Sequence, residues 1–275
     1  MISRIRHVVT ALAMTIAITG AQAEPGRIPD TQTVRNVVLV HGAFADGSGW
    51  RGVYDVLTSR GYRVSIVQNP LTSFADDVNA TRRILARQTG PSILVGHSYG
   101  GSVITEAGAD ASVAGLVYVS ALAPDAGEST GDQFKEIPAP PEFVIEPGTD
   151  GFGFVNVERF KAGFAGDTTD ADAAFLRDSQ VPINMAIFGT ALTHAAWRTK
   201  PSWAVIATQD RAIDPRLLRK QADRARAQIT EVEPRAAPHE PQHRADSDRC
   251  PSSSTARRRR SSIGVRCGLV ERELR

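Results

Sequence analysis

The chain alternates short, unbroken apolar runs with longer stretches whose apolar positions recur every three or four residues. The short runs are typical of strands that are covered on both faces, and the longer spacing is typical of amphipathic helices. The runs predict strands at residues 37–40, 93–95, 116–119 and 204–207. The alternation of Val64 and Ile66 predicts a further strand at 64–66, and residues 229–232 continue the series as the last strand. The spacing predicts helices at residues 48–60, 74–87, after residue 98, and at 214–225. This order predicts an α/β fold with a mostly parallel sheet and helices on both faces.

The first predicted helix shows how the pattern orients side chains. Trp50, Val53, Tyr54 and Leu57 recur at helical spacing, which predicts that all four lie on one face, and Gly61 supplies the stop. In the second helix the inward positions are predicted to include Val78, Ile84 and Leu85.

Residues 124–201 interrupt the alternation. They are rich in Pro, Gly and Phe and hold only short helical patterns at 157–164 and 170–176. An insertion of this kind suits a cap over a site at the carboxyl ends of the strands. A peripheral embellishment is the alternative, but it would leave several Phe side chains in need of another apolar surface, namely Phe143, Phe152, Phe154, Phe164 and Phe188.

The two ends of the chain differ from its centre. Residues 1–23 combine Arg4 and Arg6, an apolar run at 8–18 and the sequence Ala21-Gln22-Ala23, which is the pattern of a cleavable secretory signal peptide. A membrane anchor would need about 20 apolar residues. We therefore predict export to the periplasm or medium, with a domain at residues 24–233.

Residues 234–275 carry ten Arg against five Asp or Glu and contain no aromatic residue. This composition predicts a disordered tail. Because the basic excess belongs to the tail, the domain gives no reason to expect a nucleic acid partner. The two cysteines, Cys250 and Cys267, also lie there, so packing rather than disulfides must hold the domain together.

The candidate chemistry begins at Gly96-His97-Ser98-Tyr99-Gly100, which joins the strand at 93–95 to a predicted helix. The G-x-S-x-G spacing between a strand and a helix is that of a nucleophile elbow, which presents its Ser on a strained turn. Ser98 is therefore the candidate nucleophile. The amide of Tyr99, at the start of the following helix, is placed to face an oxyanion.

A second motif follows the first buried strand. His41-Gly42-Ala43 precedes a small-residue stretch that ends at Trp50. Small residues at this point let backbone amides face a ligand, so the amide of Ala43 is predicted to complete an oxyanion hole with that of Tyr99. After the strand at 204–207, Asp210 is placed to orient a catalytic His, whereas Asp214 precedes Pro215 and is predicted to cap the next helix.

Residues 36–233 resemble the α/β-hydrolase superfamily, and within it the small esterases related to plant methylesterases and hydroxynitrile lyases. The H-G-A-x-x-x-G-x-W stretch of those enzymes is matched by residues 41–50 with one extra residue before Trp50, and the elbow is matched around Ser98. The resemblance implies a Ser, Asp, His triad in that chain order, with Ser98 and Asp210 at the family's positions. No phosphate loop, dinucleotide fingerprint or zinc signature appears, so no cofactor or metal is expected.

The His of the triad is where this sequence departs from the family, in which the last strand leads to a His loop and a final amphipathic helix. Here Glu233 leads into a Pro-rich segment in which His239, between Pro238 and Pro241, is the candidate base. One hypothesis is a shift of reading frame near Glu233, and resequencing of that region tests it. A genuine polyanion-binding tail is the other interpretation.

The remaining histidines have ordinary structural explanations: His41 and His97 belong to the two turn motifs and His194 falls in the cap. The sequence thus predicts an exported serine esterase for a small-molecule ester, of undetermined oligomeric state, that is inactive if its base is missing. Two alternatives stay open. One is a non-catalytic binder of apolar ligands, and the other is a hydroxynitrile lyase that would need a cap lysine such as Lys135 or Lys161.

Overall fold

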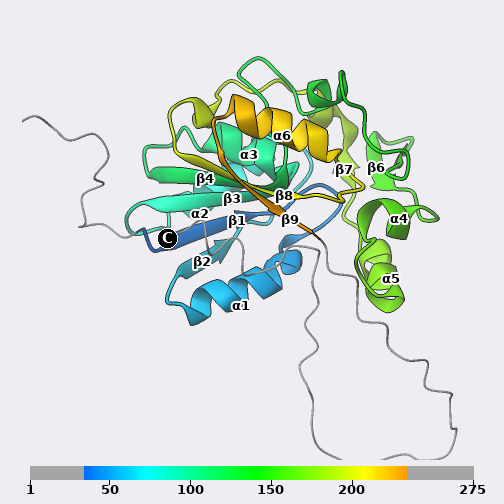
Figure 1. The fold of residues 1–275 in the computed structure, drawn as a ribbon, viewed down its shortest axis with the longest axis horizontal. Coiled ribbons are helices and arrows are strands. Elements are labelled where there is room, and N and C mark those ends of the chain that lie inside the picture. The colour runs from blue at the N-terminus through cyan, green and yellow to red at the C-terminus, as the bar shows by residue number, and fades with distance from the viewer. Residues whose placement is uncertain (1–33, 234–275) are drawn as a thin grey trace, which may run out of the picture. The chain divides into compact units, whose positions relative to one another are not determined.

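The computed structural model describes residues 34–233, and six parallel strands form their main sheet (Figure 1). In spatial order the strands are β2 (Arg63–Ile66), β1 (Asn36–Val40), β3 (Ser92–Ser98), β4 (Val113–Ala121), β8 (Ser202–Ala207) and β9 (Gln228–Val232). The chain first builds outward from β1 to β2 and then returns to β3 on the other side of β1. This reversal of order opens a crevice at the carboxyl ends of β1 and β3, where ligands bind in open α/β sheets.

Helices cover both faces of the sheet. On one face α2 (Phe74–Leu85), α3 (Gly100–Ala107) and α6 (Pro215–Arg224) pack over the larger apolar core. On the other face α1 (Arg51–Ser59) packs over a smaller core that includes Leu39 and Val95. Figure 1 shows α1 on the opposite side of the sheet from α3 and α6. The predicted fold class is therefore confirmed.

The first helix differs from its prediction in two details. A 3-10 turn, η1 (Gly47–Trp50), precedes α1, and Asp46 caps it by accepting a 2.8 Å hydrogen bond from the amide of Ser48. Val53 and Leu57 are buried as expected. Tyr54, predicted to face inward, is instead 36% exposed, so the packed face of this helix is narrower than the spacing of its apolar residues predicts.

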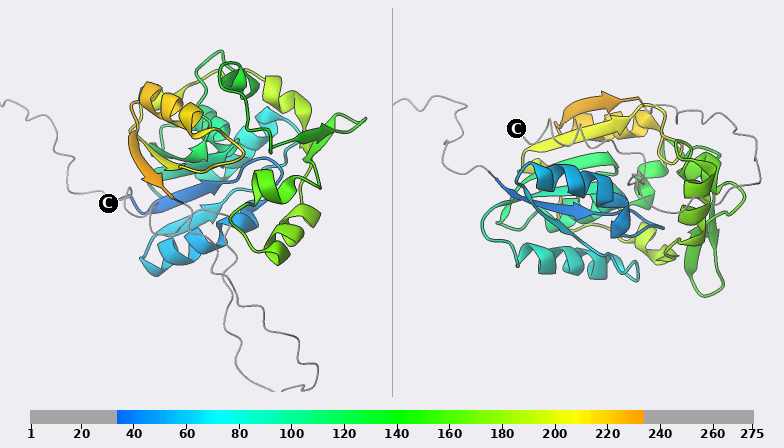
Figure 2. Two further views of the ribbon diagram at one scale, coloured as in Figure 1. Left: turned by 45° about the vertical axis from the view of Figure 1, so that its right-hand side comes forward. Right: turned by 90° about the horizontal axis from the view of Figure 1, so that it is seen from below.

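The cap, residues 124–201, contains a second sheet that the sequence pattern did not predict. Its antiparallel strands are β5 (Ile145–Pro147), β6 (Phe152–Val155) and β7 (Ile183–Asn184). The remaining cap elements are η2 (Gly131–Phe134), α4 (Phe160–Phe164), α5 (Asp170–Asp178), η3 (Met185–Gly189) and η4 (Ala196–Arg198). Of the helix predicted at 157–164, only residues 160–164 are helical, as α4. In Figure 2 α4, α5 and the small sheet stand beside the carboxyl ends of the main strands.

Within residues 34–233 no helix has the length and apolar content to cross a bilayer, and no group of His, Cys, Asp or Glu side chains there could hold a metal ion. The predicted signal peptide (residues 1–23) and tail (residues 234–275) lie outside the described residues. The candidate base His239 lies there too, together with Cys250 and Cys267.

Candidate active site

Ser98 ends β3 in a conformation that ordinary residues avoid. Its φ angle is +53°, in the left-handed region, and α3 begins two residues later with Tyr99 as its N-cap. The pairing of β3 with β4 shifts register between His97 and Ser98, so the strand bends at this point. A non-glycine residue at this φ costs about 1 kcal/mol. The strained strand-to-helix turn predicted from the sequence is present.

Two glycines let the neighbouring loop approach the elbow. A Cβ at Gly42 would lie 2.9 Å from the Cβ of Ser98, and a Cβ at Gly100 would lie 2.6 Å from the carbonyl oxygen of Val40. Real side chains do not tolerate such contacts without a shift of the backbone. The loop after β1 can therefore lie directly against Ser98 only because both positions lack a side chain.

The two amides predicted to form an oxyanion hole flank this contact. Ala43 follows Gly42, and Tyr99 follows Ser98. Among the described residues, no backbone hydrogen bond uses the N–H of either residue. Phe44, next in the loop, has a φ of +62° and its carbonyl accepts a 3.2 Å hydrogen bond from the amide of Val181 in the cap. Both donors are thus available to a ligand oxygen, and the loop that carries one of them is held in place by the cap.

The side chain of Tyr99 is fully buried and anchors the elbow. Its hydroxyl donates a 2.6 Å hydrogen bond to Oδ2 of Asp77 on α2, whose Oδ1 accepts a 2.8 Å bond from the amide of Leu71. Burial raises the pKa of Asp77 to about 6, against the opposing effect of the Tyr99 and Leu71 hydrogen bonds. Sequence analysis missed Asp77, because as the fourth helical residue after Ser73 it is typical of a solvent-facing first-turn carboxylate.

Asp210 lies after β8, one strand beyond β4 from Ser98. Its Oδ1 accepts hydrogen bonds of 2.8 Å and 2.9 Å from the amides of Ala212 and Ile213. Burial raises its pKa, while these amides and a hydrogen bond from the Ser120 hydroxyl act in the opposite direction. Ser120 also accepts a 3.1 Å bond from the amide of Ala207, so it joins β4 to β8 at the carboxylate. The carboxylate is held by its surroundings, as an orienting residue requires.

Asp214, the other carboxylate after β8, caps the next helix. It caps α6 by accepting a 2.8 Å hydrogen bond from the amide of Arg216, and its two oxygens pair with the Arg216 guanidinium. Pro215 occupies the first helical position, where it needs no hydrogen-bond acceptor. The prediction that Asp214 is a helix cap is confirmed.

The three described histidines do not contact Ser98 or Asp210 through a hydrogen bond. Nδ1 of His41 donates to the carbonyl of Gly42 at 2.9 Å, because its Nε2 accepts from the amide of Asn69 at 2.9 Å. Burial lowers the pKa of His41, so it is neutral and both ring nitrogens are occupied.

His97 and His194 are also engaged elsewhere. His97 packs edge-on against Trp50, with ring centroids 6.3 Å apart, and burial together with nearby His41 lowers its pKa to about 4. His194 bonds through Nδ1 to Glu106 of α3 at 2.8 Å. A triad base would therefore come from outside residues 34–233.

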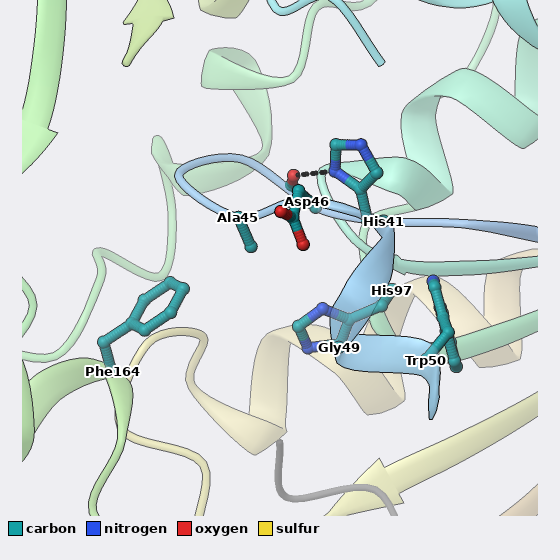
Figure 3. Close-up of a pocket in the computed structure, with 8 residues that line it drawn as sticks. His41, Ala45, Asp46, Gly49, Trp50, His97 and Phe164 are labelled. Atoms are coloured by element: carbon teal, nitrogen blue, oxygen red, sulfur yellow. Dashed lines mark hydrogen bonds between the residues drawn. The ribbon is translucent and has the colours of Figure 1, made fainter. Parts of the chain in front are cut away.

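A narrow recess that is open to solvent lies beside the elbow, between the loop after β1 and the cap. Figure 3 shows Phe164 of α4 on one side of the recess and Ala45, Asp46 and His97 on the other. The lining residues are His41, Gly42, Ala45, Asp46, Gly49, Trp50, His97 and Phe164. Asp46 is the charged residue among those that line the recess, and His41 and His97 are neutral. The recess therefore favours an uncharged, largely apolar group.

Aromatic rings continue from the recess to the elbow. Phe164 stacks on Phe143 at 6.4 Å, Phe143 meets Phe44 edge-on at 6.2 Å, and Phe188 lies 6.3 Å from Tyr99. These contacts bring the cap onto the loop after β1 and onto the elbow. Phe154, which was also expected to be covered, is 43% exposed because it alternates outward on β6 beside the buried Val155.

The two cap lysines considered at the sequence level are engaged at the surface. Lys135 is 76% exposed and pairs with Asp132 at 2.7 Å. Lys161 pairs with Asp170. Neither ammonium group lies in the recess.

Comparison with known proteins places this geometry in a family. The model of the alpha/beta hydrolase family matches residues 37–248. A pyrethroid hydrolase of Sphingobium wenxiniae is 33% identical over 160 residues, which are 49% of this chain and 56% of that protein. The alpha/beta hydrolase nvfD of Aspergillus novofumigatus is 27% identical over 200 residues, which are 64% of this chain and 78% of that protein.

The fold has counterparts among solved structures. The crystal structure of polyneuridine aldehyde esterase superimposes with a TM-score of 0.62 at 16% identity, covering 72% of this chain and 90% of that one. The match to the pyrethroid hydrolase spans only slightly more than half of that relative's length. The fold, the elbow and the family match together define a protein of the hydrolase class. The chain belongs to the alpha/beta hydrolase family.

Proposed function

We propose that the chain is a serine hydrolase that cleaves a small, apolar carboxylic ester through an acyl-enzyme on Ser98. The observation that carries the proposal is the strained elbow at Ser98, with its φ of +53° and the Gly42 loop packed against it. Strain of this kind persists where the surrounding structure enforces it, and it is common at reactive groups. Resemblance to a named pyrethroid hydrolase supports an ester as substrate.

In the proposed reaction the Ser98 oxygen attacks the ester carbonyl and its proton passes to a base. The amides of Ala43 and Tyr99 stabilise the oxyanion, an effect of about 3 kcal/mol for each donor. The base then protonates the departing alkoxide, which leaves as the alcohol. Water, activated by the same base, attacks the acyl-enzyme and releases the carboxylic acid and free Ser98.

We infer that His239 is the base. The three described histidines are committed to other contacts. Asp210 is held by the amides of Ala212 and Ile213, and none of these three histidines forms a hydrogen bond with it. His239 follows β9 in the chain, and in this family the third triad residue comes last. If the reading frame shifts near Glu233, the natural base is lost and the product is inert.

The aromatic walls indicate the substrate class. The recess lined by Trp50 and Phe164 leads to rings around the elbow, and these surfaces favour an ester with an aromatic or branched apolar group. We expect p-nitrophenyl esters of short acids to be accepted and charged esters to be poor substrates.

Hydrolysis of p-nitrophenyl acetate by the full chain tests the proposal, compared with its Ser98→Ala and His239→Ala variants. We expect activity that is lost in both. Loss in Ser98→Ala but not in His239→Ala would remove His239 from the mechanism. Activity that survives Ser98→Ala would contradict the proposed nucleophile.

A non-catalytic binder is the second candidate, because no described His reaches Asp210. A folded chain that binds an aromatic ester without hydrolysing it would support this function. A lyase of the hydroxynitrile type has less support, since Lys135 and Lys161 pair with surface carboxylates.

We further propose that the protein is exported, on the pattern of residues 1–23. Expression of the full gene followed by fractionation tests this. We expect the protein in the periplasm or medium, shortened by cleavage after Ala23. Uncleaved protein in the cytoplasm would contradict export.

A further inference from the structure

A second hollow, which shares no lining residue with the recess beside Ser98, lies where the cap joins the core. Its lining residues are Asp125, Trp197, Arg198, Arg224, Ala225 and Arg226, and its empty space is about 650 Å³. Asp125 belongs to the outgoing end of the cap insertion, and Trp197 to its return. The indole N–H of Trp197 donates a 2.9 Å bond to the carbonyl of Pro124, which ties the two ends together.

Positive charge dominates the hollow. The guanidinium groups of Arg198 and Arg224 lie 5.4 Å and 5.6 Å from the ring centre of Trp197, a separation typical of cation–π contacts. Among the described lining residues Asp125 is the one carboxylate, and it is already held by Nε and Nη2 of Arg198 at 2.7 Å and 2.5 Å. Arg224 pairs with Glu128 at 2.8 Å.

Arg226 is the third arginine of the hollow. Among the described residues its guanidinium makes no hydrogen bond or ion pair. Nη1 of Arg198 likewise donates no bond there. The hollow therefore holds one more guanidinium than the nearby carboxylates neutralise, with free donors on two of its walls.

The backbone of Arg226 supplies an independent observation. Its φ is +51°, and it follows the last turn of α6, where the amide of Ala227 bonds back to the carbonyl of Ala222 at 2.9 Å. This is the position at which helices usually place glycine, because a side chain there is strained. Arg226 is thus a strained non-glycine residue that lines the hollow together with Arg198 and Arg224, and strain of this kind is common at functional positions.

We propose that this hollow binds a small oxyanion, a phosphate or carboxylate group, between Arg226 and Arg198. Planar guanidinium groups match both chemistries with paired N–H donors. The bound group would neutralise the excess charge and join the end of α6 to both ends of the cap. The site is separate from the proposed esterase site, and its test does not depend on esterase activity.

Thermal unfolding and calorimetric titration of the full chain test the proposal, with inorganic phosphate, malonate or chloride at equal ionic strength and pH 7. We expect phosphate, malonate or both to raise the unfolding temperature in a saturable way, and chloride to have no such effect. A response to one anion alone identifies the ligand chemistry.

The key variant is Arg226→Gly, which removes the guanidinium and relieves the strained backbone. It should fold at least as stably as the wild type without anion, and bind the anion at least about tenfold more weakly. The matched control is Arg219→Gln, which removes the same charge from α6 where Arg219 pairs with Glu231, and it should bind as the wild type does. The proposal would be overturned if phosphate and malonate had no effect beyond that of chloride, or if both variants lost anion affinity equally. A marked loss of stability in Arg226→Gly without anion would also overturn it.

Discussion

The hydroxyl of Tyr99 donates a 2.6 Å hydrogen bond to Asp77, and both side chains are fully buried. Tyr99 is the residue after the proposed nucleophile, while Asp77 also holds the amide of Leu71. The amide of Asn184 in the cap bonds in turn to the carbonyl of Leu71 at 2.9 Å. One buried carboxylate thus connects the elbow, through one loop, to the cap.

Replacement of Tyr99 by Phe should destabilise the fold by about 1–3 kcal/mol, because it leaves a buried carboxylate oxygen without its donor. The effect should shrink in an Asp77→Asn background, since the two side chains act as a pair. Urea unfolding of the wild type, both single variants and the double variant measures the coupling. If the changes in unfolding free energy of the two single variants add up to that of the double variant, the Tyr99–Asp77 hydrogen bond contributes nothing to stability.

The raised pKa of Asp77 predicts a pH dependence. The folded state holds its proton up to a pKa of about 6, whereas the unfolded chain releases it near 3.8. Between these values the folded state binds more protons, so this group adds stability as pH falls. The wild type should gain about 2 kcal/mol relative to Asp77→Asn between pH 7.5 and pH 4.5. A constant difference across that range would contradict a raised pKa.

The strain at Ser98 is open to direct measurement. Ser98→Gly should be more stable than Ser98→Ala by about 1 kcal/mol, because glycine alone adopts a φ of +53° without cost. Both variants lack the hydroxyl, so the comparison isolates the backbone. Chemical denaturation gives the difference. Equal stabilities would mean that the turn relaxes and stores no strain.

The close approach of Gly42 to Ser98 predicts that Gly42→Ala reduces ester hydrolysis by at least about a hundredfold, because the added Cβ would lie 2.9 Å from the Cβ of Ser98 and displace the Ala43 amide. Gly189→Ala is the matched control, since a Cβ there meets nothing within 4 Å. Steady-state kinetics on p-nitrophenyl acetate measure both. Comparable activity in the two variants would show that the loop does not form the oxyanion hole.

Much of the fold follows from local pattern. Four strands of the main sheet were predicted from apolar runs, β2 was predicted from alternation, and β9 was predicted from its place in the series. The elbow was predicted from its glycines, and Asp214 was predicted as a cap because Asp-Pro marks a helix start. The cap sheet was not predicted, because β5, β6 and β7 are two to four residues long and depend on pairing with one another.

The site divides in the same way. Ser98 is specified by its immediate neighbours, so its turn was predicted. Asp77 and Ser120 were not, because their roles depend on partners that the fold brings from elsewhere in the chain: Tyr99 lies 22 residues from Asp77, and Ala207 lies 87 residues from Ser120. The positions of Asp210 and His239 in a triad stay predictions, since no contact with a base is described.

The central claim is that Ser98 is an activated nucleophile. Intact-mass measurement after treatment with a fluorophosphonate probe tests it most directly, because labelling requires a reactive hydroxyl and not a particular ester. We predict one adduct on the wild type and none on Ser98→Ala, with both proteins folded by circular dichroism. A folded wild type that takes up no probe, or a Ser98→Ala variant that is labelled equally, would contradict the claim.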